Sequence, residues 1–177
     1  AMAAALHDVE SDAPVTYVSQ PLSFSFSMPV SVVFGAGKRH LAGELLKSYG
    51  TKALVVTDSV TNGRDLVNEV EKSLKDAGIS VTRFAHVTGK SLDITANSAV
   101  DEIKKDGSDF IVAIGSNTVM EGAKMIARAA ASTLDQAILP LTFVPTNYHT
   151  GACFDASLPD GSRDQALLAK VVIVDPE

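Results

Sequence analysis

The sequence lacks several features that mark common classes of protein. It has a single cysteine, Cys153, so an internal disulfide is excluded. Its apolar runs, such as those at residues 110–114 and 171–174, are far shorter than the ~20 residues that a membrane-spanning helix needs, so we expect no membrane association. The N-terminus has neither the basic start nor the continuous apolar core of a secretory signal, which favours a cytoplasmic location.

Clustered positive charge is missing as well. Asp and Glu number 21 against 15 Lys and Arg, and the basic residues are scattered along the chain. A nucleic-acid-binding surface needs concentrated basic residues, so nucleic acid is not an expected partner. The composition that remains, 46% hydrophobic and 20% charged, is that of a globular protein. The length suits one domain, which we assign to residues 15–177, after a flexible segment of small and polar residues at 1–14.

Strand and helix patterns alternate along the folded part. Strict apolar/polar alternation over residues 22–28 predicts a half-buried strand, and the following Pro29 favours a hairpin or an edge strand because proline cannot donate to a central ladder. Short connections between the later patterns favour a doubly wound, Rossmann-like α/β fold with a mostly parallel sheet. Further strands are predicted at residues 53–57, 79–84, 110–114, 138–144 and 171–174, and helices at 66–77, from a cap at Asp93 to near Gly107, and at 119–131.

Polar residues follow three of the predicted strands. In open parallel sheets, ligands bind outside the carboxyl ends of the strands, so these loops are the first places to look for a site. Asp58 follows the first strand, residues 115–118 (Gly-Ser-Asn-Thr) follow the second, and residues 145–151 (Pro-Thr-Asn-Tyr-His-Thr-Gly) follow the third. Each loop also has a plain structural interpretation, as a surface aspartate or as a turn that caps a helix.

Five short motifs in a fixed order resemble one known family. They are Phe-Gly-Ala-Gly at 34–37, Val-Thr-Asp at 56–58, the run from Gly115 to Lys124, the loop at 145–151 and Val-Ile-Val-Asp-Pro-Glu at 172–177. Together they resemble the N-terminal nucleotide-binding domain of the iron-dependent (group III) alcohol dehydrogenases, which are related to glycerol dehydrogenase and dehydroquinate synthase. The resemblance implies an NAD(P)-binding domain of an alcohol or aldehyde oxidoreductase.

The resemblance also implies which residues bind the nucleotide. The family's Gly-Gly-Gly-Ser-x-x-Asp-x-Ala-Lys is matched literally at Gly115, Ala123 and Lys124. Ser116 and Asn117 stand where the family has glycines, so we expect a weakened phosphate loop ahead of a helix that begins near Val119. The cofactor-binding candidates are Asp58 for the adenosine ribose, Gly115, Ser116, Asn117 and Thr118 for the phosphates, Glu121 at the position of the family's Asp, and Thr146 and Thr150 for the nicotinamide and ribose region.

No metal site is predicted in this chain. In the family, an Asp and several His on a helical second domain hold the metal, and that domain follows the Asp-Pro segment near which this sequence ends. The four histidines, at positions 7, 40, 86 and 149, are too far apart for a helical ligand pair. We therefore expect the helical domain to be absent and the chain alone to be inactive in hydride transfer.

Two alternatives remain if the chain is a complete and divergent protein. It could be a non-redox binding or interaction module that uses the nucleotide cleft for a small molecule. It could instead be an enzyme repurposed around Tyr148, His149, Cys153 and Asp155, which supply acid, base and thiol chemistry in one loop. In either case the face left uncovered by the missing helical domain favours a homodimer, for which residues 22–28 supply a pairing edge.

Overall fold

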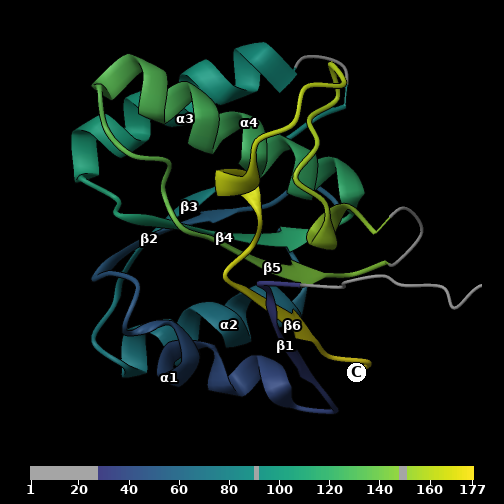
Figure 1. Cartoon of the computed structure of the whole chain (residues 1–177). Coiled ribbons are helices and arrows are strands. Elements are labelled where there is room, and N and C mark those ends of the chain that lie inside the picture. The colour runs from purple at the N-terminus through teal and green to yellow at the C-terminus, as the bar shows by residue number, and fades with distance from the viewer. Residues whose placement is uncertain (1–27, 90–91, 148–150) are drawn as a thin grey trace, which may run out of the picture.

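The computed structural model describes residues 28–89, 92–147 and 151–177, and within them six parallel strands form one sheet. The order across the sheet is β1-β6-β5-β4-β2-β3, with every neighbouring pair parallel (Figure 1). This confirms the predicted Rossmann-like α/β fold. The strands are β1 (Ser31–Phe34), β2 (Lys52–Val56), β3 (Ser80–Phe84), β4 (Phe110–Gly115), β5 (Leu141–Pro145) and β6 (Val171–Val174).

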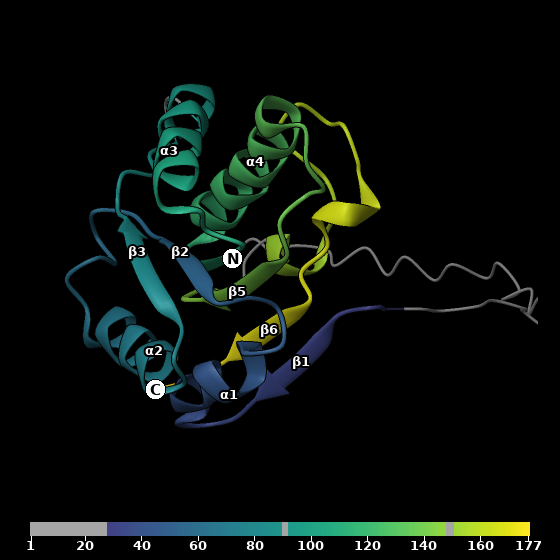
Figure 2. The same cartoon turned by 90° about the vertical axis from the view of Figure 1, so that its left-hand side faces the viewer.

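Helices cover both faces of the sheet. In Figure 1, α3 (Leu92–Asp106) and α4 (Asn117–Leu134) lie above it, and α1 (Ala42–Leu46) and α2 (Asp65–Asp76) lie below it. The turned view shows the sheet between these two layers (Figure 2). Three short 3-10 turns complete the described chain, namely η1 (Lys38–Leu41), η2 (Ala152–Phe154) and η3 (Gln165–Leu167).

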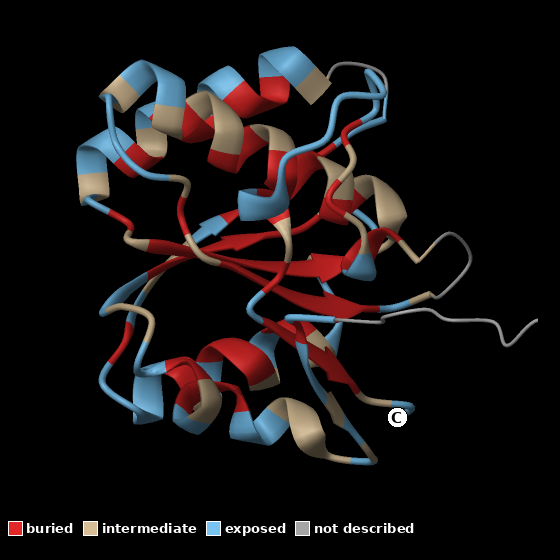
Figure 3. Cartoon of the chain, in the orientation of Figure 1, coloured by how far each residue is buried: buried red, intermediate tan, exposed pale blue. Residues whose placement is uncertain are grey.

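The central strand β4 shows why the sheet is buried on both sides. Side chains alternate between the two faces of a strand, so a strand covered on both faces must be apolar throughout. Ile111 and Ala113 belong to the core between the sheet and helices α3 and α4. Val112 and Ile114 belong to the core between the sheet and helices α1 and α2. Figure 3 shows the buried residues concentrated in the sheet and on the helix faces that meet it.

Most element boundaries agree with the sequence patterns, but the patterns do not predict β1, η1 or α1 as separate elements, and α4 ends at Leu134 rather than at residue 131. Three further boundaries differ. Helix α4 begins at Asn117 rather than near Val119, because Ser116 already has the extended backbone of an N-cap (φ −79°, ψ 177°). Helix α3 begins at Leu92, so Asp93 lies in its first turn and is not the cap. The strand predicted from residue 138 begins only at Leu141. Glycines in the left-handed region follow the ends of α2 and α3, with Gly78 at φ 82° and Gly107 at φ 72°.

The strand β1 lies at the edge of the sheet and pairs only with β6 among the described residues. Val32 and Phe34 on this strand are exposed. Most of the predicted strand at 22–28 and the segment at 1–14 lie outside the described residues, so the hairpin and the homodimer remain predictions. Among the described helices, none is long and apolar enough to cross a bilayer.

The packing of α1 on α2 depends on Gly43. A Cβ at this position would lie 2.1 Å from the Ser73 carbonyl oxygen and 2.7 Å from the Ala77 Cβ. G43A must push the two helices apart, so we expect it to lower the free energy of unfolding by about 1–3 kcal/mol in urea denaturation.

The matched control is G63A, because nothing lies within 4 Å of a Cβ at Gly63. This variant should be neutral or more stable by up to about 1 kcal/mol, since alanine restricts the unfolded chain. Equal effects of G43A and G63A would contradict the close approach of α1 to α2.

Candidate functional site

The loops after β2 and β4 leave the sheet in opposite directions. The chain passes from β2 to α2 below the sheet, and from β4 to α4 above it, although β2 and β4 are hydrogen-bonded neighbours (Figure 1). In doubly wound folds such a divergence marks the crevice, at the carboxyl ends of the two strands, where ligands bind. Asp58 follows β2 at this crevice, and Gly115 ends β4 there.

Gly115 allows α4 to start directly against the sheet. Its φ is 154°, and a Cβ here would lie 2.7 Å from the Val119 Cγ2 atom, so a side chain would force the helix away. The Ser116 carbonyl accepts hydrogen bonds from the N–H groups of Val119 (3.0 Å) and Met120 (3.1 Å). The structure thus places Asn117 and Thr118 in the first helical turn, and not in a loop before it.

The start of α4 presents free N–H groups to the crevice. The first N–H groups of a helix have no acceptor within the helix itself. The Ser116 side chain, at the N-cap, makes no capping hydrogen bond to the described residues. Asn117 and Thr118 are only half-buried. An anion at this position would meet backbone donors and the positive end of the helix dipole.

Asp58 is held by its own loop through one carboxylate oxygen. Its Oδ1 accepts from the Thr61 N–H (2.6 Å), and its backbone carbonyl accepts from the Asn62 N–H (2.9 Å). No further hydrogen bond reaches this half-buried carboxylate from the described residues. The neighbouring Thr57 is fully buried, and its Oγ1 has no hydrogen-bond partner in the described chain. The second Asp58 carboxylate oxygen therefore has no partner among the described residues, whereas Thr57 Oγ1 is enclosed by the fold.

The loop after β5 is hydrogen-bonded to the end of β4. The Thr146 N–H donates to the Gly115 carbonyl (2.8 Å), so the ends of β4 and β5 are fixed to each other. Thr146 itself is exposed and lines a hollow of about 260 Å³ with Arg64, Leu66 and the end of β6. Tyr148, His149 and Thr150 lie outside the described residues, so their predicted roles remain predictions.

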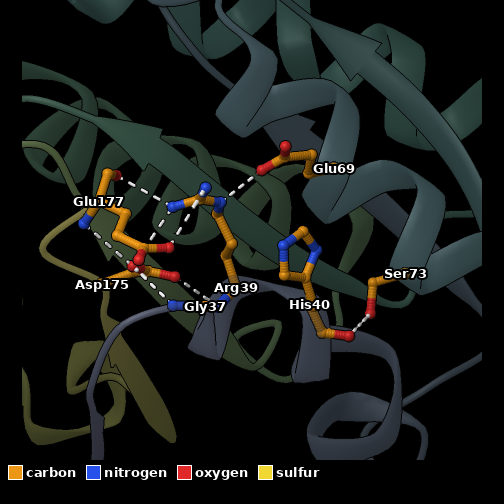
Figure 4. Close-up of polar contacts among 7 residues, drawn as sticks. All are labelled: Gly37, Arg39, His40, Glu69, Ser73, Asp175 and Glu177. Atoms are coloured by element: carbon orange, nitrogen blue, oxygen red, sulfur yellow. Dashed lines mark hydrogen bonds and ion pairs between the residues drawn. The ribbon is translucent and has the colours of Figure 1, made fainter.

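The buried Asp175 carboxylate links the turn after β1 to the residues after β6. The Asp175 side chain is 1% exposed and accepts from the backbone N–H groups of Gly37 (3.2 Å), Arg39 (3.0 Å) and Glu177 (3.1 Å). The Arg39 guanidinium forms an ion pair with Asp175 (3.3 Å) and also pairs with Glu69 of α2 (Figure 4). This network fixes the Phe-Gly-Ala-Gly turn, α2 and the end of β6 against one another.

Glu121 lies beside a buried lysine that the sequence patterns did not single out as functional. Lys124 is 1% exposed, and its Nζ donates to the Ser157 carbonyl (3.3 Å). Burial lowers the pKa of this amine, against the opposing charges of Asp155 and Glu121. Glu121, Lys124 and Asp155 line a hollow of about 220 Å³. The only indication of Lys124 in the sequence was its identity with the lysine of the family motif.

The residues proposed for repurposed chemistry have a less reactive setting. Cys153 is buried, and burial raises the pKa of its thiol, which keeps it protonated and poorly nucleophilic. Asp155 is engaged by the Ser157 hydroxyl (3.1 Å) and by Arg163 (3.5 Å). Burial works to raise the pKa of Asp155, but the hydrogen bonds from Ser157 and the charge of Lys124 outweigh it and lower that pKa. These contacts give Asp155 a structural role in its loop.

Metal ligands are not grouped in the described chain. Residues 28–89, 92–147 and 151–177 contain no set of three or more His, Cys, Asp or Glu side chains arranged to hold a metal ion. The described residues at the carboxyl ends of β2 and β4 thus comprise a helix start without a side-chain cap and the half-buried Asp58 carboxylate.

Comparison with known proteins gives one consistent family. Residues 29–176 match the family described as iron-containing alcohol dehydrogenase. The NAD-dependent methanol dehydrogenase of Bacillus methanolicus is 29% identical over 174 residues, covering 86% of this chain and 46% of that enzyme. This chain thus spans less than half the length of that relative.

Solved structures agree with this assignment. An iron-containing alcohol dehydrogenase from Thermotoga maritima is 26% identical with a TM-score of 0.71, covering 87% of this chain and 48% of that one. An archaeal alcohol dehydrogenase from a Red Sea brine pool has a TM-score of 0.76 at 22% identity, covering 88% and 47%, and supports the fold alone.

The Asp175 network predicts a specific loss of stability in acid. Burial works to raise the pKa of Asp175, but the N–H groups of Arg39, Glu177 and Gly37 and the Arg39 charge outweigh it and lower that pKa. A carboxyl group with a lowered pKa in the folded state stabilises the protein above its unfolded pKa, and this contribution is lost as pH falls through the folded pKa.

We expect D175N to lower the free energy of unfolding by about 3 kcal/mol at pH 7, because the variant leaves Arg39 without its buried partner. The deficit should begin to shrink below about pH 4, where the Asp175 carboxyl group of the unfolded chain takes up a proton, and should continue to shrink as pH falls through the lowered pKa of the folded state. Denaturant unfolding at several pH values measures both effects. D76N, which breaks an exposed ion pair with Lys72, is the control and should cost at most about 1 kcal/mol. A D175N deficit that does not change with pH would contradict the charged network.

Proposed function

The chain belongs to the iron-containing alcohol dehydrogenase family, and on that basis we propose that it binds NAD in the crevice between β2 and β4, as the nucleotide-binding part of an alcohol or aldehyde oxidoreductase. The crevice lies at the point where the strand order reverses, which is the ligand position of doubly wound folds. The methanol dehydrogenase relative is described as NAD-dependent, which supports the choice of nucleotide.

The start of α4 carries this proposal. Gly115 brings the helix close to the sheet, and the free N–H groups of the first turn point to a place for the pyrophosphate. Two family glycines are Ser116 and Asn117 here, so Cβ atoms stand where the backbone would otherwise approach the phosphates unhindered. Both side chains offer hydrogen-bond donors, so the proposal includes binding that is weaker rather than lost.

Asp58 supplies the preference for NAD over NADP in this proposal. One carboxylate oxygen is taken by the Thr61 N–H, and the other is left for the adenosine ribose hydroxyls. A 2′-phosphate at the same place would bring its negative charge against the carboxylate. In this proposal Thr146, whose N–H donates to the Gly115 carbonyl, would line the nicotinamide side of the site.

The bound nucleotide would supply the hydride chemistry at nicotinamide C4. The residues of this chain would bind and orient the nucleotide and exclude water from the buried side of the crevice. We assign no metal step to the described residues, because they contain no metal-binding group of side chains. Nucleotide binding without hydride transfer is therefore the activity proposed for this chain by itself.

Isothermal titration calorimetry tests the proposal. We expect NAD to bind to the purified chain more tightly than NADP. Failure of the unaltered chain to bind either nucleotide would refute the proposal and would favour an interaction module instead.

Restoring the family glycines tests the altered phosphate turn. We expect S116G/N117G to raise the affinity for NAD by about tenfold, an effect of roughly 1.4 kcal/mol. The same calorimetry measures it. S132G/T133G is the control, because it also replaces two adjacent polar residues with glycine, near the opposite end of α4, and should leave the affinity unchanged. A lower affinity in S116G/N117G would instead indicate that the Ser116 and Asn117 side chains are themselves ligands of the phosphates.

A further inference from the structure

An ion-pair network on β3 reaches the loop that carries Asp58. Arg83 lies on the edge strand β3, where it pairs in register with Val55 of β2. Its Nε donates to Glu71 Oε1 (2.5 Å), and its Nη1 lies 3.3 Å from both the backbone carbonyl and the side-chain Oδ1 of Asn62. Its Nη2 donates to Asn68 Oδ1 (2.9 Å). One guanidinium thus joins α2 to the loop after β2.

The Asn62 contacts connect Arg83 to Asp58. The Asn62 N–H donates to the Asp58 carbonyl, and the Thr61 N–H donates to Asp58 Oδ1. The orientation of the Asp58 carboxylate therefore depends on the loop at residues 58–62, and Arg83 is hydrogen-bonded to the last residue of this loop, Asn62. The loop forms neither a helix nor a strand, so the hydrogen bonds from Arg83 to Asn62 limit the positions that the Asp58 carboxylate can adopt.

The charge of Arg83 is matched within the network. The Glu71 side chain is 9% exposed and receives a hydrogen bond from Arg83 and a second from Lys75 (3.3 Å). Burial works to raise the pKa of Glu71, but these two cations outweigh it and lower that pKa, so the carboxylate stays ionised. The Arg83 guanidinium is accordingly engaged by Glu71, Asn62 and Asn68, and the Glu71 carboxylate offsets its charge.

We propose that Arg83 is a positioning residue for nucleotide selectivity: it fixes the loop at 58–62 so that Asp58 keeps one oxygen directed at the adenosine ribose, and its own charge is withheld from a 2′-phosphate. The inference rests on the proposed binding of NAD at this crevice. It assigns selectivity to a residue of β3 that has no motif around it, in addition to the aspartate that contacts the ribose.

The variant R83K separates this role from a purely structural one. A lysine ammonium can still pair with Glu71, but it lacks the planar fork that reaches Asn62 and Asn68 at the same time. We expect R83K to keep its thermal stability near that of the unaltered chain, and to bind NAD about fivefold or more weakly with little change for NADP. K75M is the control, because it removes the other, exposed partner of Glu71 without touching Asn62, and it should leave the ratio of the two affinities unchanged.

A double-mutant cycle with D58N shows whether Arg83 acts through Asp58. We expect D58N alone to reduce the preference for NAD, and R83K to have no further effect on selectivity in the D58N background. Additive effects of the two substitutions, or unchanged selectivity in R83K while the unaltered chain binds NAD, would overturn the inference alone. Absence of binding of either nucleotide to the unaltered chain would refute the proposed function and with it the inference.

Amide hydrogen exchange tests the linkage without any nucleotide. The N–H groups of Thr61 and Asn62 are the ones bonded to Asp58, so their exchange reports how firmly the loop is held. We expect faster exchange at both positions in R83K and no change in K75M. Unchanged exchange in R83K would show that Arg83 does not hold the loop, and would overturn the inference even if the fold is intact.

Discussion

The parallel direction of all six strands is the constraint on which the rest of this molecule depends. Parallel neighbours cannot be joined by tight turns, so the chain must cross over the sheet between them, and helices consequently cover both faces. The same constraint brings every carboxyl end to one edge. Residues far apart in the sequence, such as Asp58, Gly115 and Asp175, therefore lie along one edge of the sheet. The position of the candidate site follows directly from the parallel arrangement of the strands.

Carboxylates held by backbone N–H groups organise that edge. Asp175 is fully engaged, with three N–H donors and the Arg39 guanidinium, and it fixes the β1 and β6 end of the sheet. Asp58 has a single donor among the described residues and keeps capacity for a ligand. The two residues look alike in the sequence, since each follows a short apolar strand. The larger number of hydrogen-bond donors around Asp175 indicates a structural role, whereas the single donor to Asp58 leaves it as a candidate ligand-binding residue.

The elements of the fold could largely be predicted from the sequence, whereas the network around the site could not. The apolar run of β4 and the helical spacing of α2 indicated their elements because burial on two faces or on one leaves a periodic pattern. The start of α4 was placed two residues late, since Asn117 and Thr118 are polar and carry no periodic signal. The role of Arg83 could not be predicted from the sequence, because its partners Glu71 and Asn62 lie in a helix and a loop that are separated from it along the chain.

The sequence by itself determined the family, the α/β class and the glycine that ends β4, because these depend on local pattern and on a backbone position that excludes a side chain. Only the tertiary structure decided which polar residues are engaged. It showed Lys124 and Cys153 to be buried, Asp175 to be saturated with donors, and one oxygen of Asp58 to be left open. The physical reason is that desolvation and hydrogen-bond partners come from neighbours across the fold, and no single stretch of sequence contains them.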